Sequence, residues 1–351
     1  MIQPTPLNIQ SLNALSFDVF NLDDETVIDE LNDIDPDLCF YNQISTNLSS
    51  NYYSENSFHR LNESKDPSLS ILHCNIRSFF ANKNDLFNMI SSLNYQFSVI
   101  CLSETWLTHN NYEYACIPNY NHELRTRNNK SGGGVSIFIN DDIKYSLRDD
   151  ISCMDDHIES IYLEIDRNSV KSDHNIIIGC VYRPPKASIV DFNESLKSVI
   201  DCLSAEKKHI YLAGDFNINL LNTNSHKPSS DFIEILFSNS LFPSINKPTR
   251  VTQSSATIID NIFVNNLLNK SVTSGILADP ISDHLPVFCI TPIQTNKSKQ
   301  TFITKRIFSD RNKTKFTDLL NSVNWDPCYA QTECQAAFTT FYNTYKTCFD
   351  Q

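Results

Sequence analysis

Eight short apolar runs constrain the fold of this chain more than any other feature of its sequence. Each run is bounded by turn signals or by helical patterns, which is typical of β-strands. The runs cover residues 69–76, 97–104, 134–140, 160–166, 175–182, 209–215, 258–264 and 286–291. Many strands with only a few helices predict an α/β fold in which sheets pack together and helices cover them on the outside.

Three segments between these runs have the periodicity of amphipathic helices. In one, the apolar residues of 189–203 fall on one face, and Ser188 followed by Asp191 forms a capping-box pattern at its start. The stripe within 232–237 follows Ser229-Ser230, which we expect to cap a second helix. The stretch NKNDLFNMISSL at 82–93 predicts a third.

The acidic residues are concentrated before the first run. Residues 1–68 contain 12 Asp and Glu against 2 Lys and Arg, and we expect this segment to be mostly disordered, with a short helix around 24–32. The rest of the chain has 29 acidic against 26 basic residues and is therefore nearly neutral. The overall charge of −13 thus leaves a nucleic-acid partner possible.

The remaining sequence predicts four parts in total. After the acidic segment, 69–292 form one domain, 293–312 a polar linker, and 313–351 a helical extension. No run approaches the ~20 apolar residues of a membrane span, and the N-terminus lacks the pattern of a secretory signal. The 11 cysteines include no CxxC pair, which favours a reduced intracellular protein without a zinc site.

Polar side chains gather where the predicted strands end. Taken singly, each has an ordinary explanation as a turn, a surface charge, a packed aromatic ring or a loop. The set comprises Asn75, Glu104, Tyr182, Asp215, Asn217, Asp260, Asp283 and His284. Together they suit a divalent-metal phosphodiesterase, because Mg²⁺ prefers a few carboxylates and several waters. Phosphodiester cleavage also needs an activated water and donors for the developing negative charge.

The motifs around these residues resemble a known superfamily. They read HCNIRSFF (73–80), CLSETWL (101–107), VYRPP (181–185), GDFNINLL (214–221), IIDNIF (258–263) and SDH (282–284). In this order they resemble the endonuclease/exonuclease/phosphatase superfamily. The resemblance is closest to the endonuclease domain of LINE-type (non-LTR, jockey- and CR1-like) retrotransposons. It covers about 69–292 and implies a four-layer α/β/β/α sandwich of the apurinic-site endonuclease and deoxyribonuclease type.

The resemblance also implies the metal side of a site. Glu104 would be the principal ligand of Mg²⁺ or Mn²⁺, with Asp283 close to the metal and Asn75 ordering the network around it. Apurinic-site endonucleases have an acidic ligand two residues after the Asn, where this chain has Arg77. A cation there cannot bind metal and would instead contact a phosphate, so metal binding is expected to be weak.

On the phosphate side, the resemblance assigns Asp215 as the base or water-orienting group and Asn217 as the residue that positions the nucleophile or phosphate. His284, paired with Asp260, would donate to the scissile phosphate. Tyr182 would hydrogen-bond the same group. The pairing is physically reasonable, since a carboxylate orients an imidazole and favours its charged form.

Four arginines are candidates for substrate binding: Arg77, Arg125, Arg127 and Arg183. Arg125 and Arg127 precede three consecutive glycines at 132–134. A phosphate-cradling loop would be followed by a helix, but here a predicted strand follows. The glycines therefore predict a tight turn, and the basic stretch before them would lie along a DNA backbone.

The sequence thus predicts a Mg²⁺-dependent endonuclease that nicks target DNA in retrotransposition, acting in the nucleus. Partners beyond DNA would be the element RNA or a reverse transcriptase, before which the chain would stop. Two other interpretations remain: a phosphatase or phosphodiesterase of inositol lipids or similar small substrates, and a catalytically silent remnant that binds nucleic acid. Retention of all the site residues argues against the remnant.

Overall fold

The computed structural model describes residues 50–61, 68–127, 132–252, 255–265, 272–292 and 310–349. It divides into two compact units, Met1–Gln300 and Thr301–Gln351. The predicted helix at 24–32 and most of the predicted linker lie outside the described residues. No helix in the described part of the chain is long and apolar enough to cross a membrane.

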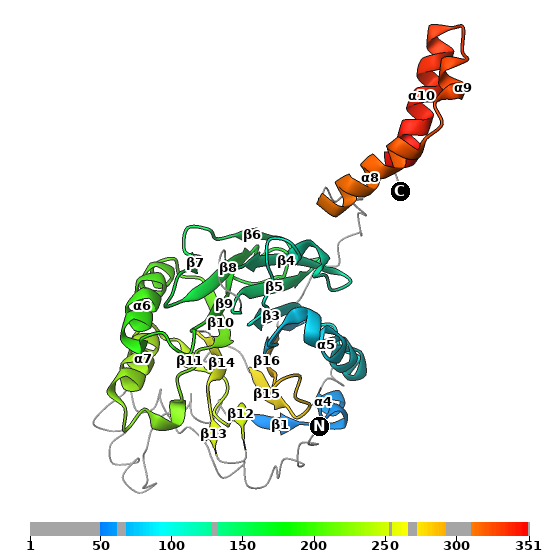
Figure 1. Ribbon diagram of the computed structural model, residues 1–351. Helices are drawn as coiled ribbons and strands as arrows, with labels where there is room; N and C mark the ends of the chain where they lie inside the picture. The colour runs from blue at the N-terminus through cyan, green and yellow to red at the C-terminus, as the bar shows by residue number, and fades with distance from the viewer. Residues whose placement is uncertain are drawn as a thin grey trace, which may run out of the picture. The chain divides into compact units, whose positions relative to one another are not determined.

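The first unit is built on two large sheets that pack face to face (Figure 1). The first sheet contains, in spatial order, β1 (Asn51–Tyr53), β15 (Thr273–Leu277), β16 (Val287–Pro292), β2 (Ser68–Asn75), β3 (Val99–Ser103), β5 (Val135–Asn140) and β4 (Tyr120–Arg125). The second contains β11 (Phe242–Pro243), β14 (Asp260–Val264), β10 (His209–Asp215), β9 (Ile176–Tyr182), β8 (Glu159–Ile165) and β6 (Tyr145–Leu147), with β7 (Cys153–Met154) also paired to β8. A small ribbon joins β12 (Arg250–Val251) to β13 (Ala256–Thr257).

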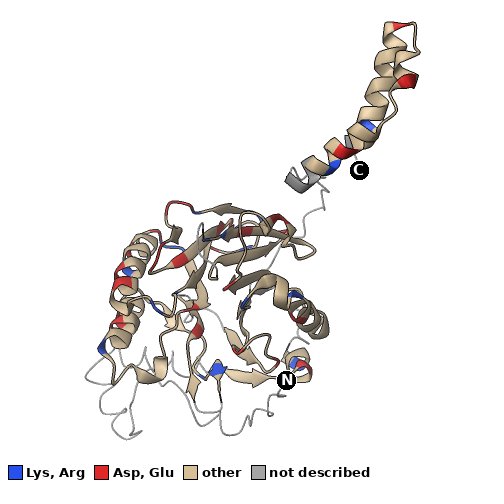
Figure 2. Cartoon of the chain, in the orientation of Figure 1, with Lys and Arg blue, Asp and Glu red and all other residues tan. Residues whose placement is uncertain are grey.

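Helices cover the outer face of each sheet and complete the predicted four-layer α/β/β/α sandwich (Figure 1). On the first sheet these are α4 (Glu55–Leu61) and α5 (Phe79–Leu93). On the second they are α6 (Ile189–Ala205) and α7 (Lys227–Ser238), which carry charged residues of both signs (Figure 2). All eight predicted strands are present, with ends shifted by no more than two residues.

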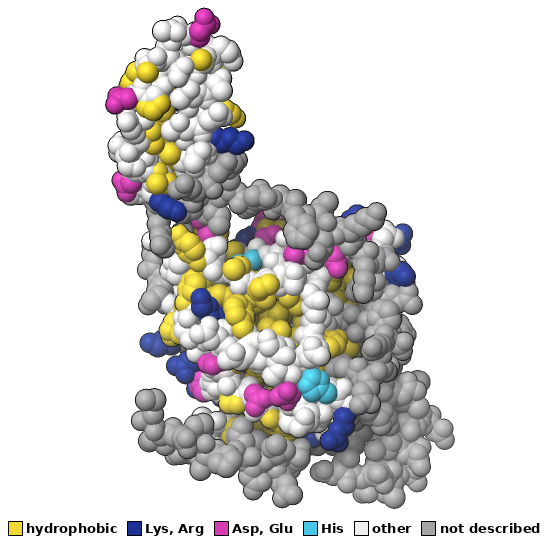
Figure 3. Space-filling view, turned by 90° about the vertical axis from the view of Figure 1, so that its right-hand side faces the viewer, with side chains coloured by type: hydrophobic (Ala, Val, Ile, Leu, Met, Phe, Trp, Pro, Cys, Tyr) yellow, Lys and Arg dark blue, Asp and Glu magenta, His cyan; other side chains and the backbone are white. Residues whose placement is uncertain are grey.

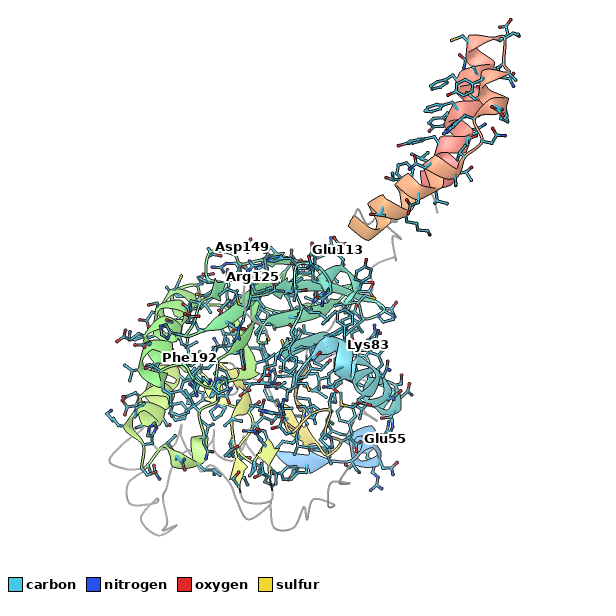
Figure 4. All side chains as sticks on the ribbon, viewed as in Figure 1. Glu55, Lys83, Glu113, Arg125, Asp149 and Phe192 are labelled. Atoms are coloured by element: carbon cyan, nitrogen blue, oxygen red, sulfur yellow. The ribbon has the colours of Figure 1, made fainter. Side chains whose placement is uncertain are left out.

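Alternation along the strands divides the core into layers. Ile71 of β2 and Ile178 of β9 point into the space between the sheets. Their neighbour Leu72 faces the helices of the first sheet. On the other side Phe192 of α6 packs with Phe216 against the second sheet (Figure 4). A surface cleft of about 590 Å³, lined largely by apolar residues, lies between α5 and 117–120. Figure 3 views this side and shows hydrophobic side chains gathered on it.

The domain begins earlier than the sequence predicted. Strand β1 pairs in parallel with β15, with Asn51 opposite Gly275, and Phe58 of α4 is fully buried against Phe97 and Phe288. The prediction of disorder is therefore wrong for 50–61. A three-residue strand and a seven-residue helix have too few periodic positions to stand out from the polar segment around them.

The start of one helix also differs from the sequence-based prediction. Helix α7 begins at Lys227 with Pro228 in its first turn, so the prediction that Ser229-Ser230 caps it is wrong. Proline suits that position because its missing N–H has no helical partner there. Ser188 does cap α6, accepting from the Asp191 N–H. Short 3₁₀ turns occupy Tyr112–Tyr114 and Leu220–Asn222.

The second unit is helical, as the pattern of 313–351 predicted. It comprises α8 (Asp310–Ser322), α9 (Asp326–Tyr329) and α10 (Cys334–Phe349). Aromatic residues pack within it, including the tilted pair of Trp325 and Phe341 with ring centroids 5.6 Å apart.

Strand directions bring the polar strand ends to one edge of the sandwich. Strands β2 and β3 are parallel and end together, as do β9 and β10. In the second sheet Asp215, at the end of β10, lies opposite both Tyr182 of β9 and Asp260 at the start of antiparallel β14. Residues far apart in sequence therefore meet because carboxyl ends of parallel strands share an edge with the amino end of an antiparallel one.

Gly214 allows this edge to close. A Cβ atom at this position would lie 1.9 Å from the carbonyl oxygen of Val181 on the neighbouring strand, which is far inside van der Waals contact. Backbone atoms of a central strand cannot move aside without breaking the ladder that aligns Asp215 with Tyr182.

We expect Gly214→Ala to lower the free energy of unfolding by ~1–3 kcal/mol or more, because the added methyl group overpacks a central strand pair. Urea denaturation followed by circular dichroism measures the change. Ser238→Ala at the exposed end of α7 serves as a control, with an expected effect within ~0.5 kcal/mol. Equal stability of Gly214→Ala and the control would contradict the explanation.

Candidate active site

A cleft of about 1080 Å³ opens at this edge of the sandwich. Its walls come from the segments that follow β2, β3, β9 and β10, from those between β4 and β5 and between β7 and β8, from Arg250 of β12, and from the segment that precedes β16. The lining residues include Arg77, Glu104, Trp106, Arg127, Tyr182, Asn217, Arg250, Asp283 and His284. Most of the residues singled out from the sequence therefore surround one space.

Asn75 links the two sheets at the base of the cleft. Its Nδ2 donates to Glu104 Oε1 at 3.0 Å and to Asp215 Oδ2 at 2.8 Å. Tyr182 donates its hydroxyl to the same Glu104 oxygen at 3.1 Å. One amide and one phenol thus fix the carboxylate of the first sheet relative to the buried carboxylate of the second.

Asp215 and Asn217 form a compact turn at the end of β10. The Asn217 backbone N–H donates to Asp215 Oδ1 at 3.0 Å, and its side-chain Nδ2 donates to Asp215 Oδ2 at 3.1 Å. Asn217 has φ 49°, a left-handed conformation that Asn tolerates better than most residues. Phe216 between them is 1% exposed and packs on the helix side of the second sheet.

His284 and Asp260 are paired, as the resemblance implied. His284 Nδ1 lies 2.9 Å from Asp260 Oδ2 and 3.2 Å from Oδ1, and both residues are buried. Thr249 donates its hydroxyl to Asp260 Oδ2 at 2.8 Å. With Nδ1 engaged by Asp260, Nε2 is the imidazole nitrogen left for a molecule in the cleft.

The buried charges shift one another's pKa values. Burial, and then the Asp260 carboxylate, raise the pKa of Asp215 to about 7. Burial opposes the charged form of His284, but the Asp260 carboxylate outweighs it and raises the pKa of His284 to about 9. Burial would raise the pKa of Asp260, yet the His284 cation holds it below its usual value. Near neutral pH the pair is therefore an ion pair.

Asp283 is held by two arginines. Arg77 Nη1 donates to Asp283 Oδ1 at 2.9 Å. Arg250 donates to Oδ2 through Nε at 2.9 Å and through Nη2 at 2.7 Å. Burial raises the pKa of Asp283, but Arg250, His284 and Arg77 together outweigh burial and hold that pKa below its usual value. Arg77 lines the cleft, as expected for a substrate contact, but its resting partner is a carboxylate that was predicted to lie near a metal.

The prediction that Arg183 binds substrate is wrong. The residue is only 4% exposed, and its guanidinium makes four hydrogen bonds to backbone carbonyls, which belong to Pro184, Ala187, Phe216 and Asn217. Arg183 therefore fastens the RPP turn to the GDFN turn. The sequence could not distinguish a buried guanidinium from one that faces the cleft.

Of the other two arginines predicted to bind substrate, one lines the cleft and one does not. Arg127 lines the cleft and pairs with Glu159, which also accepts the Gly134 N–H at 2.6 Å. Arg125 forms an ion pair with Asp149 outside the cleft lining (Figure 4). Contact of either with substrate stays a prediction. The three glycines all have positive φ, in agreement with the predicted turn.

Glu104 fits a hard divalent metal. Its described hydrogen-bond partners are neutral side chains, namely Asn75, Tyr182 and Trp106, so its negative charge faces the cleft without a compensating cation among them. Mg²⁺ keeps several waters and needs only one or two carboxylates. Asp283 is a poorer ligand, because a metal would compete with Arg77 and Arg250 for its oxygens.

Two groups of metal-ligating side chains occur among the described residues. One is Asp215, Asp260 and His284, of which Asp260 and His284 already form a hydrogen bond with each other. The other joins Asp173, His174 and His209 at the start of β10, and hence at the opposite end of that strand from Asp215.

Sequence reasoning missed several residues of the site. Arg250 and Thr249 lie in KPTR, a polar segment without periodicity. His73 is fully buried, with Nδ1 3.9 Å from Asp260 Oδ1, and burial lowers its pKa to about 4. Its signal was a polar residue inside the apolar run 69–76. Trp106 lies in SETW, directly after the polar residues at the end of β3, and this position was its signal in the sequence.

A four-layer α/β/β/α fold with a buried polar network at one edge of its sheets places this chain in a class of phosphoester hydrolases. The model of the endonuclease/exonuclease/phosphatase family matches residues 72–284, and the chain belongs to that family. No curated protein matches the chain in a sequence comparison.

Three solved structures share the fold at low sequence identity. The endonuclease domain of TRAS1, a telomere-specific non-LTR retrotransposon, is 13% identical with a TM-score of 0.52 over 65% of this chain and 100% of that chain. The APE2 catalytic domain of Xenopus laevis is 15% identical with a TM-score of 0.50, over 66% and 94%. The AP endonuclease LMAP of Leishmania major is 12% identical with a TM-score of 0.50, over 64% and 88%.

The raised pKa of His284 gives a test of the ion pair. We expect Asp260→Asn to lower the pKa of His284 from about 9 by at least ~1 unit in the metal-free protein. The substitution removes the carboxylate that attracts the charged imidazole, whereas burial still disfavours the charged form. Proton NMR titration of the imidazole, assigned with His284→Gln, measures it. Asp231→Asn on the surface of α7 should leave the value unchanged. An unaltered pKa in Asp260→Asn would contradict the pairing.

The same pair affects stability with a defined sign. The pKa of His284 is raised on folding, so the pair stabilises the fold fully below the usual histidine value of ~6.5. That contribution is lost as the pH rises through about 9.

We expect Glu104→Gln to weaken Mn²⁺ binding at least ~10-fold, because it removes a cleft carboxylate whose described hydrogen-bond partners are all neutral side chains. Asp283→Asn should weaken binding less, since Arg77 and Arg250 already occupy its oxygens. Electron paramagnetic resonance of free Mn²⁺ measures both without reference to activity. A larger loss in Asp283→Asn than in Glu104→Gln would reverse the assignment of the principal ligand.

Proposed function

We propose that this protein is a Mg²⁺- or Mn²⁺-dependent DNA endonuclease that nicks one strand. The observation that carries the proposal is the convergence, in one cleft, of the Glu104 carboxylate, the Asp215–Asn217 turn and the Asp260–His284 ion pair. Hydrolysis of a phosphodiester needs a metal-holding carboxylate, a group that orients water and a donor for the phosphate. Each has a candidate here.

Asp215 is the group proposed to orient the attacking water and take its proton. Three hydrogen bonds, from the Asn75 amide and from the Asn217 backbone and side chain, fix the plane of its carboxylate. A base held in this way loses little freedom when substrate arrives. The Asn217 side chain also donates to the Arg183 carbonyl at 2.9 Å, which ties the turn to the neighbouring strand.

His284 is proposed to stabilise the phosphate as its charge develops. Asp260 holds Nδ1 and favours the charged ring, so Nε2–H is available to a phosphate oxygen in the cleft. Tyr182 donates to Glu104 and thereby orients that carboxylate. A divalent metal held by Glu104 would supply positive charge to the scissile phosphate.

We further propose that the domain derives from a LINE-type retrotransposon and nicks target DNA in the nucleus. The support is the ordered series of motifs from HCNIR to SDH, together with a fold shared with the endonuclease domain of TRAS1, a telomere-specific non-LTR retrotransposon. In this proposal the element RNA or a reverse transcriptase is a further partner.

Conversion of supercoiled plasmid to the nicked form tests the activity. We expect nicking with Mg²⁺ or Mn²⁺ that EDTA abolishes and that Asp215→Asn lowers by ~10²–10⁴-fold, the usual contribution of a general base. Asp231→Asn makes the same chemical change on an exposed face and should retain full activity. Nicking that persists both in EDTA and in Asp215→Asn would overturn the proposal.

A parallel assay separates the substrate classes. Release of inorganic phosphate from inositol polyphosphates, in the absence of plasmid nicking, would favour a small-molecule phosphatase on the same fold. Both activities depend on Asp215 if the chemistry is shared, so Asp215→Asn belongs in both assays.

A further inference from the structure

We propose that Trp106 forms a nucleobase-binding subsite next to Glu104, so that the preferred DNA presents an unpaired or easily unstacked base beside the scissile phosphate. This inference rests on the proposed DNA substrate and names the form of DNA that the cleft selects. Neither the metal nor the base chemistry of Asp215 requires a tryptophan at this position.

Trp106 is held out of the core between two anchored neighbours. Thr105 is 1% exposed and Leu107 is 3% exposed, whereas Trp106 is 41% exposed and lines the cleft. Of the cleft residues in the described part of the chain, it alone is a large exposed aromatic. An apolar ring kept in water at a polar site indicates a binding role more than a packing role.

The backbone fixes the position of the ring. Trp106 has φ 54° and Glu104 has φ 52°, both in the left-handed region that non-glycine residues rarely adopt. The Trp106 N–H donates to the Gly133 carbonyl at 2.9 Å, and the Thr105 N–H donates to Gly134 at 3.2 Å. The glycine turn therefore holds SETW in place, and the indole is presented by a rigid segment.

The described hydrogen bond of the indole uses the edge of the ring. Nε1–H donates to Glu104 Oε2 at 3.3 Å, and a hydrogen bond from an indole lies in the plane of the ring. Gly132 lies near the same nitrogen, because a Cβ there would be 3.7 Å from Nε1. The contact that orients the ring thus uses neither π-face, and a π-face is what a base stacks on.

The cleft also offers cations for the phosphates of a nucleotide strand. Its lining has four acidic residues and four basic ones, and the basic side chains, which can contact phosphates on either side of the site, are Arg77, Arg127, Lys186 and Arg250. A base in a duplex is stacked on its neighbours and cannot stack on Trp106. Single strands, junctions and easily opened steps can, and this gives the cleft a preference that does not depend on base identity.

The chain itself supplies the reporter for a test. It contains only two tryptophans, so Trp325→Phe in the full-length protein leaves Trp106 as the single indole fluorophore. Fluorescence and the anisotropy of a labelled oligonucleotide are followed together in EDTA, which prevents cleavage. The probes are a thymidine oligomer and an abasic oligomer of equal length, which have the same phosphates but differ in the bases.

We expect the thymidine oligomer to quench Trp106 fluorescence as it binds, and the abasic oligomer to bind more weakly with little quenching. Trp106→Leu should weaken binding of the thymidine oligomer ~5- to 150-fold, as loss of one stacked base does, but leave the abasic oligomer almost unaffected. Trp106→Phe keeps an aromatic face without the N–H donor and should retain most of the binding.

The outcomes separate the two proposals. Binding of both oligomers with equal quenching, or equal thymidine binding by Trp106→Leu and wild type, would overturn the base subsite and leave the endonuclease proposal intact. If Trp106→Phe loses as much binding as Trp106→Leu, the indole serves only to orient Glu104 and the subsite is overturned. Absence of binding to either oligomer would overturn the DNA substrate and the subsite together.

Discussion

The site depends on placing two buried carboxylates opposite each other on neighbouring strands. Asp215 and Asp260 are paired across β10 and β14, and both are fully buried. Two like charges in such a place are strongly unfavourable unless other groups compensate them. His284 supplies a positive charge to Asp260, and Asn75 with Asn217 donates hydrogen bonds to Asp215. The polar network is therefore a condition for folding this edge as well as a feature of the chemistry.

Much of this arrangement could be predicted because it follows from periodicity. The short apolar runs predicted the strands, and the polar residues at their ends indicated that Asn75, Glu104 and Asp215 lie at one edge of the sheets. Periodicity says nothing about a side chain in an irregular segment. Arg183 was therefore predicted to bind substrate although it is buried. Arg250 was not predicted as a site residue although it forms an ion pair with Asp283. The direction of a long, flexible side chain depends on tertiary contacts that one sequence does not reveal.

The pair of arginines on Asp283 sets this chain apart from a site built of several free carboxylates. Arg77 occupies a position where apurinic-site endonucleases have an acidic metal ligand, and its ion pair with Asp283 removes a second candidate. Between Asp283 and Glu104, Glu104 is the carboxylate better suited to a metal. A metal held there would gain much of its affinity from the substrate phosphates, because a hard cation with one protein carboxylate must complete its shell from waters or ligand. Arg77 and Arg250 can also exchange Asp283 for phosphate oxygens.

The loops around the cleft carry strain that the rest of the domain holds in place. Arg77, Ser78, Glu104, Trp106 and Asn217 all have positive φ, and each such residue costs on the order of 1–3 kcal/mol. Backbone bonds from Ser78 to Glu104 at 2.8 Å and from Trp106 to Gly133 at 2.9 Å lock these conformations. Two sheets and two helical layers provide the stability that offsets them. A cleft strained in this way is already arranged before substrate binds, so binding energy is not spent on ordering Glu104 or Trp106.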